Sequence, residues 1–361
     1  MPKRKSPKPR FYDWGRTFTH QTGSDGQICV VVGGKGIGKT FGLRKALIKK
    51  HLKTGACFAE IFRSKSEKDE ACKGYFDKLQ HEGFFKNYVF KTDKDGGFIA
   101  PYVDDLSDAE WQRICYFVAL TNFQAEKKRT YAAVESVIYD EFIIDSRDRY
   151  HRYLPNEYAL LANLLDTIFR EQPNDGIQRR LYLLGNSCGL VNPYFEAFGI
   201  DRIPDYGYSW HMGKTVLLHR VPPIDADARR ESTFVGKMLA GTAESDMIFD
   251  NRFDTGYTGD IETKTPEAKY MYSIVYGDRC FALWIDRKQG HLYVCKKEPK
   301  GKNAKRFKLS KSDGGINRAA VRMADDVIKF VVECYYANLI RYETVQLRAL
   351  FFGVLDILGI K

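Results

Sequence analysis

The chain has 361 residues, of which 44% are hydrophobic and 14% aromatic, and it carries a formal net charge of +11. This composition supports a large core, excludes global disorder and leaves room for two domains. The 8 cysteines include no C-x-x-C pair and the 7 histidines show no metal-ligand spacing. A zinc site and a secreted disulfide framework are therefore not expected. The expected location is a reducing cytoplasm. No apolar run reaches membrane-spanning length, so no membrane partner is expected.

Residues 1–26 are expected to form a basic tail followed by a short aromatic lead. The first ten residues are rich in lysine and arginine and hold no acid. Such a tail fits a solvated, disordered segment and a nucleic-acid arm equally well. The aromatic lead contains Phe11, Tyr12 and Trp14.

Residues 28–40 join an apolar run to the complete G-x-x-x-x-G-K-T phosphate-loop pattern. A strand at 28–32 and a helix at 40–52 give this loop the strand–loop–helix context that nucleotide binding requires. Backbone N–H groups of the loop surround a phosphate, Lys39 reaches the β- and γ-phosphates, and the Thr40 hydroxyl ligates Mg²⁺. ATP and Mg²⁺ are thus the expected cofactors, against the alternative of a glycine-rich turn without ligand. The residues expected to contact the nucleotide are Gly33, Gly34, Lys35, Gly36, Ile37, Gly38, Lys39, Thr40 and Phe41.

The next stretch of the chain alternates expected strands and helices. A strand at 56–62 follows the first helix, with Gly55 as the helix C-cap. Ser66 is expected to open a second helix, because Asp69 stands in capping-box position. Short strands are expected at 84–103, a helix at 107–114, and a strand at 115–120.

The segment Ser136-Val-Ile-Tyr-Asp-Glu141 predicts a short apolar strand that ends in two adjacent carboxylates. Asp140 at the strand end is suited to bind the Mg²⁺, directly or through a neighbouring ligand. Glu141 suits a general base that orients and activates water. Two solvated loop acids are the alternative, and the upstream phosphate loop favours the functional interpretation. The Asp-Glu pair is typical of hydrolysing motors rather than of kinases.

A further strand at 181–185 ends in Asn186, and a helix is expected before it at 156–169. If this strand lies between the phosphate-loop strand and the Asp-Glu strand, Asn186 reaches the water at the γ-phosphate. An ordinary turn-starting asparagine fits the local sequence equally well. The pattern indicates an α/β P-loop NTPase of the additional-strand, catalytic-glutamate type with a RecA-like parallel sheet. Lys39, Glu141 and Asn186 are its expected catalytic residues.

Regularity is lost over residues 216–250, which contain Pro222-Pro223, and 222–250 are expected to be a linker. Strands at 270–276, 280–286 and 291–295 and a helix at about 317–341 then predict a smaller β-rich domain. Ten basic residues and a single acid, Glu298, lie between residues 287 and 311. A basic β-ribbon formed by 291–295 and 306–309 that contacts nucleic-acid phosphates is favoured over a solvated hairpin. The basic residues are Arg287, Lys288, Lys296, Lys297, Lys300, Lys302, Lys305, Arg306, Lys308 and Lys311.

Several stretches of the chain resemble the DNA encapsidation proteins, the genome-packaging ATPases of small short-tailed phages with protein-primed linear genomes. The Pro-Asn-Glu and Asn-Pro-Tyr-Phe stretches are more specific than the phosphate loop. The matching segments are Gly34-Lys-Gly-Ile-Gly-Lys-Thr40, Tyr139-Asp-Glu-Phe142, Leu154-Pro-Asn-Glu157, Leu165-Asp-Thr-Ile-Phe-Arg170, Gly185-Asn-Ser187, Val191-Asn-Pro-Tyr-Phe195, Asp250-Asn-Arg-Phe253, Ser273-Ile-Val-Tyr276 and Trp284-Ile-Asp286.

The resemblance implies a ring of five copies that docks on the portal of an empty capsid and drives double-stranded DNA inward with ATP. It implies a location in the host cytoplasm and transiently at the portal vertex of the procapsid, but not in the mature virion. In some members a structural RNA helps to attach the motor, and the sequence leaves open whether this chain uses one. Subunit number, step size, direction and portal-facing surface are not encoded in any recognisable pattern.

The resemblance also implies residue roles. Arg170 matches an arginine finger that acts on the ATP of the neighbouring subunit, with a solvated residue at a helix end as the alternative. Arg63 and Lys65 match a basic lid segment near the nucleotide, and Lys127 matches a second basic residue placed near the subunit interface. The C-terminal domain is expected to be similar to a ribonuclease-H-type nuclease without its catalytic acids, so nuclease activity is not expected. The longer N-terminal lead and the expanded region 66–115 depart from the family pattern.

The expected domains are a tail and lead at 1–26, a P-loop ATPase domain at 27–221, a linker at 222–250, and a nucleic-acid-binding, vestigial-nuclease-like domain at 251–361. Two other functions remain open. A helicase or another ring-forming P-loop translocase is the first, although no second P-loop-like core is evident. A non-catalytic nucleic-acid-binding capsid-assembly protein is the second, which the intact phosphate loop and Asp-Glu pair disfavour.

Overall fold

A computed structural model gives the fold of the chain as two compact units. The first unit comprises residues 1–200 and 204–254, and the second comprises residues 201–203 and 255–361. The predicted linker at 222–250 therefore falls within the first unit. The structure describes residues 11–21, 27–145, 152–170, 176–202, 205–225, 231, 233–242, 245, 249, 258–276, 279–299, 304–309 and 328–358.

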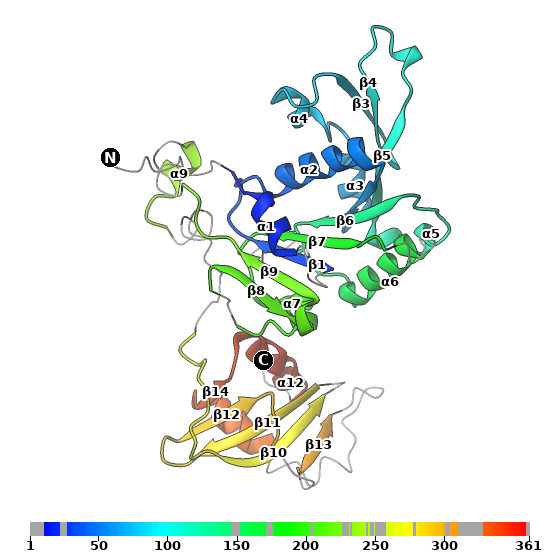
Figure 1. The fold of residues 1–361 in the computed structure, drawn as a ribbon. Coiled ribbons are helices and arrows are strands. Elements are labelled where there is room, and N and C mark those ends of the chain that lie inside the picture. The colour runs from blue at the N-terminus through cyan, green and yellow to red at the C-terminus, as the bar shows by residue number, and fades with distance from the viewer. Residues whose placement is uncertain are drawn as a thin grey trace. The chain divides into compact units, whose positions relative to one another are not determined.

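The first unit is built on a nine-stranded sheet whose central strands β5, β2, β6, β7, β1 and β9 run parallel (Figure 1). The order places β7 between β1 and β6, so the predicted insertion of this strand is confirmed. The carboxyl ends of all three strands therefore meet at one edge of the sheet. In sheet order the strands are β3 (Tyr88–Asp93), β4 (Gly96–Pro101), β5 (Gln112–Ala119), β2 (Cys57–Phe62), β6 (Val134–Asp140), β7 (Arg180–Gly185), β1 (Ile28–Val32), β9 (Val216–Arg220) and β8 (Gly207–His211).

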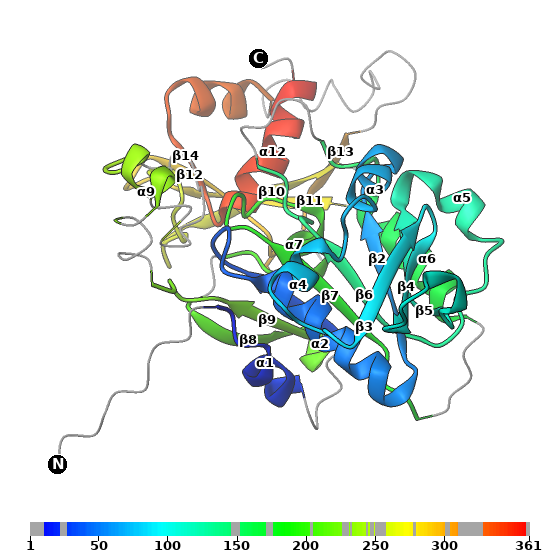
Figure 2. The ribbon, with the colours of Figure 1, turned by 90° about the horizontal axis from the view of Figure 1, so that it is seen from above.

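Helices cover both faces of this sheet. Figures 1 and 2 show α2 along one face and α6 on the other. Leu43, Leu47 and Ile48 of α2 form a core cluster with Cys29 and Val31 of β1, as expected for a strand buried on both faces. The helices of this unit are α1 (Trp14–Gln21), α2 (Lys39–Thr54), α3 (Lys65–Ala71), α4 (Asp77–His81), α5 (Phe123–Glu126), α6 (Glu157–Phe169), α7 (Pro193–Phe198) and α9 (Phe234–Met238). Short 3₁₀ turns occur at Leu106–Asp108, Leu120–Asn122 and Met212–Lys214.

Several predicted elements are confirmed, among them the helix C-cap at Gly55 and the α6 helix. The predicted N-cap of α3 is wrong. Ser64, not Ser66, is the cap, and Glu67, not Asp69, completes the capping box. Residues 109–114 are not helical, because β5 begins at Gln112 and pairs with both β2 and β4.

Strand β9 corrects the expectation of irregular structure from residue 216 onward. Residues Val216–Arg220 pair in parallel with β1, and β8 pairs with β9 in antiparallel fashion. Sheet pairing thus overrides a local sequence that shows little period-2 alternation. The short α1 helix over the aromatic lead was also not predicted.

The second unit contains a five-stranded sheet in the order β13-β10-β11-β12-β14. Its inner face packs Phe281 and Val294 against Val331 and Phe351, which belong to the helix at 328–336 and to α12. The helix predicted for 317–341 ends earlier, because residues 340–342 form a strand, and residues 310–327 lie outside the described part. The elements are β10 (Lys269–Tyr276), β11 (Arg279–Asp286), β12 (His291–Cys295), β13 (Arg306–Leu309), β14 (Ile340–Tyr342) and α12 (Val345–Ile357).

The predicted two-stranded basic ribbon is wrong in its pairing. The strands expected to form it are β12 and β13, which are separated by β10 and β11 in the sheet. β13 instead pairs in parallel with β10. Over the described ranges, none of the helices combines the length and the apolar character that a membrane crossing requires.

Candidate active site

The phosphate loop lies between β1 and α2 and depends on glycine at two positions. Gly38, the residue before α2, has a φ of 85°, which side chains other than glycine rarely adopt. A Cβ atom on Gly33 would lie 2.8 Å from Cβ of Val221, so the start of the loop is packed too closely for a side chain. The loop therefore has the local geometry that the sequence pattern predicts.

Lys39 is the first residue of α2, and its ammonium lies inside the loop. Nζ donates to the carbonyl oxygens of Gly33 at 3.0 Å and Gly34 at 2.9 Å, and to Oδ1 of Asn186 at 3.1 Å. The residue is only 6% exposed. Lys39 and the predicted sensor Asn186 are thus brought together by the adjacency of β1 and β7.

The predicted metal ligands Thr40 and Asp140 are also in contact. The Thr40 hydroxyl donates to Oδ2 of Asp140 at 2.6 Å. Burial raises the pKa of Asp140 above its usual range. A hydroxyl and a carboxylate oxygen are hard donors that suit Mg²⁺, and a nearby cation would favour the ionised carboxylate. The two residues therefore fit a magnesium ion.

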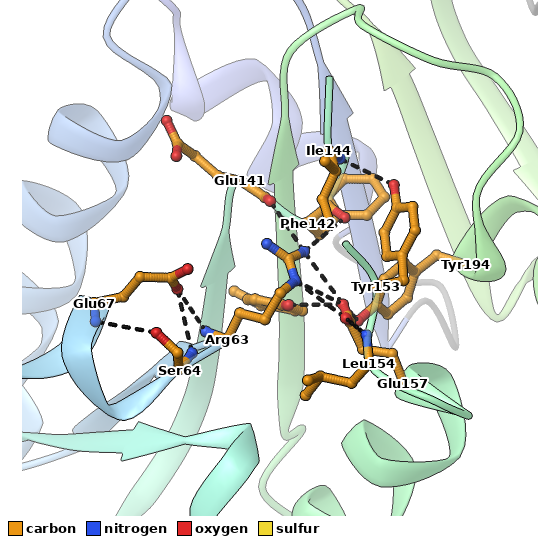
Figure 3. Close-up of polar contacts among 11 residues, drawn as sticks. Arg63, Ser64, Glu67, Glu141, Phe142, Ile144, Tyr153, Leu154, Glu157 and Tyr194 are labelled. Atoms are coloured by element: carbon orange, nitrogen blue, oxygen red, sulfur yellow. Dashed lines mark hydrogen bonds and ion pairs between the residues drawn. The ribbon is translucent and has the colours of Figure 1, made fainter. Parts of the chain in front are cut away.

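Glu141 follows β6 with an unusual backbone and an exposed side chain. Its φ is 53°, in the left-handed region, and its N–H donates to Oδ1 of Asp140 at 3.0 Å. In Figure 3 the Glu141 carboxylate points away from the neighbouring Arg63 guanidinium. Arg63 therefore contacts the main chain of Glu141 but not its carboxylate.

A cavity of about 740 Å³ adjoins these residues. It is lined by the predicted site residues Lys35, Asp140, Glu141 and Asn186. The volume falls within the range of small-molecule sites. The structure thus gathers residues from the end of β6 and from the segments that follow β1, β6 and β7 around one cavity at the carboxyl edge of the parallel strands.

The comparisons with known proteins agree with this geometry. The family model of the podovirus DNA encapsidation protein (Gp16) matches residues 18–357. The chain belongs to the podovirus DNA encapsidation protein family.

Curated relatives in this family are phage packaging proteins. The DNA packaging protein of Bacillus phage B103 is 33% identical over 264 residues, which cover 73% of this chain and 76% of the relative. The DNA packaging protein of Bacillus phage phi29 is 29% identical over 269 residues, 73% of each chain. A solved structure of the bacteriophage phi29 viral genome packaging motor assembly matches the fold with a TM-score of 0.69 at 21% identity, covering 97% of this chain and 99% of that one.

The family resemblance also implied roles for Arg63, Lys65 and Lys127. Arg63 lines the cavity, but its guanidinium is hydrogen-bonded to Glu157 and to two main-chain carbonyls. Lys65 is exposed at the start of α3. Lys127, at the C-cap of α5, lies exposed with Nζ 4.3 Å from the ring centre of Phe123.

Arg170 is the C-cap of α6 and is not among the residues lining the cavity of its own chain. Its Nη2 donates to Oδ2 of Asp166 at 3.0 Å, and both side chains are more than half exposed. The guanidinium is therefore presented at the surface rather than to the nucleotide loop of the same chain.

The basic residues of the second unit are only partly free. Arg306 is paired with Glu298, with Nη2 and Oε2 2.5 Å apart, and this contact lowers the pKa of Glu298 to about 2. Lys296 is 3.1 Å from Asp201. Lys300, Lys302 and Lys311 lie outside the described residues, as does the segment Asp250–Phe253. Among the basic residues predicted between 287 and 311, those described with exposed side chains are Arg287, Lys288, Lys296, Lys297, Lys305, Arg306 and Lys308.

Two features of the site were not predicted from the sequence. The aromatic lead supports the loop, since the Trp14 indole donates to the Lys39 carbonyl and the Tyr12 N–H donates to the Ile37 carbonyl, both at 2.8 Å. The buried Glu60 of β2 accepts hydrogen bonds from Arg44 and Tyr75, and Arg44 and Glu60 both line the cavity. A glutamate in the middle of the apolar segment Cys-Phe-Ala-Glu-Ile-Phe is the signal that could have revealed this network.

Proposed function

We propose that the chain is the ATP-hydrolysing subunit of a motor that moves double-stranded DNA into a preformed phage capsid. Family membership supports DNA packaging. The observation that supports ATP hydrolysis is the cavity that Asp140, Glu141 and Asn186 line together, with the Lys39 ammonium hydrogen-bonded to Asn186. This set contains a phosphate-binding cation, a metal-binding carboxylate, a second carboxylate and a polar sensor, which together serve ATP hydrolysis.

Each residue has a proposed role that follows from its place. The loop N–H groups and Lys39 bind and orient the phosphates, and Thr40 and Asp140 hold Mg²⁺, which neutralises phosphate charge when bound. Glu141 accepts a proton from the attacking water as general base. Asn186 shares its amide oxygen with Lys39 and is positioned to orient that water.

The partners follow from the same proposal. We assign the chain to a homo-oligomeric ring, with five copies as in the family, that docks on the capsid portal and acts in the host cytoplasm. The surface position of Arg170 supports a ring, because a guanidinium outside its own nucleotide cavity is available to a neighbour. A packaging RNA remains an additional candidate partner.

We assign DNA contact to the second unit, on a ribonuclease-H-like scaffold without nuclease activity. Exposed basic side chains on β13 and around the β11–β12 turn support this assignment. Across the described ranges, no group of three or more His, Cys, Asp or Glu side chains is placed to hold a metal ion.

The decisive test of the function is ATP hydrolysis measured with and without duplex DNA. The wild-type ring should hydrolyse ATP faster when duplex DNA is present. Lys39→Ala should lose nucleotide binding itself, because its ammonium lies inside the loop and donates to Gly33, Gly34 and Asn186. Equilibrium binding of a fluorescent ATP analogue measures that loss. Wild-type protein without ATPase activity would contradict the proposal, and strand displacement would favour the helicase alternative.

The DNA contacts should be made to phosphates rather than to bases, because packaging accepts any sequence. Replacing Lys288, Lys297, Lys305 and Lys308 with alanine should weaken duplex binding equally for unrelated sequences. It should also flatten the slope of log affinity against log salt by up to about 0.9 for each lysine that neutralises a phosphate. Fluorescence anisotropy over a salt series measures both effects, and DNA-free ATP hydrolysis should not change.

A matched control has the same change of charge in the first unit. Lys49, Lys53, Lys86 and Lys94 are exposed there, and their replacement by alanine should leave the salt slope nearly intact. If both quadruple variants flatten the slope equally, the effect is one of net charge and not of a site on the second unit.

A further inference from the structure

A buried carboxylate, Glu157, lies beside the active site and is fully hydrogen-bonded (Figure 3). It is the first residue of α6, and its side chain is 0% exposed. Its oxygens accept from the hydroxyls of Tyr139 at 2.9 Å and Tyr194 at 2.7 Å, and from the N–H of Leu154 at 2.8 Å. A charge buried this deeply requires a charged partner.

That partner is Arg63, which follows the end of β2. Its Nε lies 3.0 Å from Oε2 of Glu157, and the two side chains form an ion pair. The N–H of Arg63 also donates to Oε2 of Glu67, the capping-box residue of α3, at 2.9 Å. Both the backbone and the side chain of Arg63 are therefore fixed by buried or partly buried contacts.

The same guanidinium reaches the main chain of the catalytic turn. Nη2 of Arg63 donates to the carbonyl oxygens of Glu141 at 3.3 Å and Phe142 at 3.2 Å. Figure 3 shows this guanidinium between the turn and the Glu157 carboxylate, with the Glu141 side chain directed away from it. Arg63 therefore touches the peptide units on the C-terminal side of Glu141 but not its carboxylate.

The backbone at Glu141 is one that needs such support. A non-glycine residue with a φ of 53° is uncommon, and it persists when the surrounding structure holds it in place. The φ and ψ angles of this residue determine where its carboxylate projects. A group that fixes the following carbonyls thus fixes the orientation of the proposed general base.

We propose that Arg63, held by Glu157, is a positioning residue that fixes the turn at Glu141 and so aims its carboxylate at the attacking water. The inference rests on the proposed ATPase function and goes beyond it, because the family resemblance implied only a basic lid residue near the nucleotide. The bonds of Arg63 to Glu157 and to two carbonyls support positioning over phosphate binding.

The test uses a pair of substitutions that leaves no uncompensated buried charge. Arg63→Met combined with Glu157→Gln removes the donors to the Glu141 and Phe142 carbonyls, and the glutamine oxygen still accepts from Tyr139 and Tyr194. The matched control is Tyr194→Phe, which removes a hydrogen bond from the same carboxylate and leaves the Arg63 contacts in place. Thermal unfolding confirms that each variant is folded.

The expected result is a drop in kcat of the double variant of roughly ten- to a hundredfold, with the KM for ATP and the binding of an ATP analogue within about threefold of wild type. Tyr194→Phe should keep most of the wild-type kcat. In a Glu141→Gln background the double substitution should cause little further loss in single-turnover assays, because Arg63 acts through Glu141.

Three outcomes would overturn the inference. The first is unchanged kcat in the folded double variant, and the second is a loss of ATP binding equal to the loss of kcat. The third is a full additional loss on top of Glu141→Gln, which would show a role independent of that residue. Failure of the proposed function is distinguishable, since it would appear as absent ATP hydrolysis in the wild-type protein or as normal turnover in Glu141→Gln alone.

Discussion

Glu141→Gln is expected to retain ATP binding and to lose turnover by about a hundred- to ten-thousandfold, the range usual for loss of a general base. Glutamine keeps the size and hydrogen-bonding ability of the side chain but cannot accept the proton. Lys39, Thr40 and Asp140 are unchanged, so the phosphate and metal contacts remain. Release of phosphate in steady state and binding of an ATP analogue measure the two effects separately.

Glu70→Gln provides the matched control. Glu70 lines the same cavity, but it is exposed and pairs with Lys73 at 2.8 Å. The same chemical change there should leave turnover nearly unaltered. Near-normal turnover in Glu141→Gln would remove this residue from the role of base, and an equal loss in Glu70→Gln would point to a general effect of charge in the cavity.

The sequence predicts those parts of the site that a local motif or the polar end of an apolar strand marks. The phosphate loop is one uninterrupted motif, and its glycines are required by local backbone geometry at Gly38. Asp140 and Asn186 each mark the end of an apolar strand, and parallel strands bring their ends to one edge. The order of β1, β7 and β6 could be proposed because Asn186 can reach the γ-phosphate only if its strand lies between the other two.

The features that were missed depend on long-range pairing. Strand β9 exists because it is paired with β1, and nothing in its local pattern distinguishes it from a loop. The ion pair of Arg63 and Glu157 joins residues that are 94 positions apart. The basic segments of the second unit are close in sequence, which predicted one ribbon, whereas the sheet places two strands between them. The short separation of the two basic segments along the chain predicted that they pair. The observed strand order shows that they do not.

Arg170→Ala is expected to lose ATP turnover by roughly a thousandfold or more if this residue is an arginine finger. The reason is that a guanidinium that neutralises charge on the γ-phosphate acts mainly in the transition state, so ATP binding should change little. Asp166→Ala is the matched control, because it breaks the 3.0 Å contact of Arg170 and leaves the guanidinium itself intact. That variant should hydrolyse ATP at close to the wild-type rate.

Mixing two inactive proteins distinguishes a finger that acts on the neighbouring subunit from one that acts within its own chain. In a ring assembled from Arg170→Ala and Glu141→Gln subunits, some interfaces join an intact Glu141 on one subunit to an intact Arg170 on the next. Those interfaces should hydrolyse ATP, so activity should rise from near zero for either protein alone to a maximum at an intermediate ratio. If Arg170 acted within its own chain, every subunit of the mixture would lack one of the two groups. Turnover would then stay at the background at all ratios, and the proposed role between subunits would be wrong.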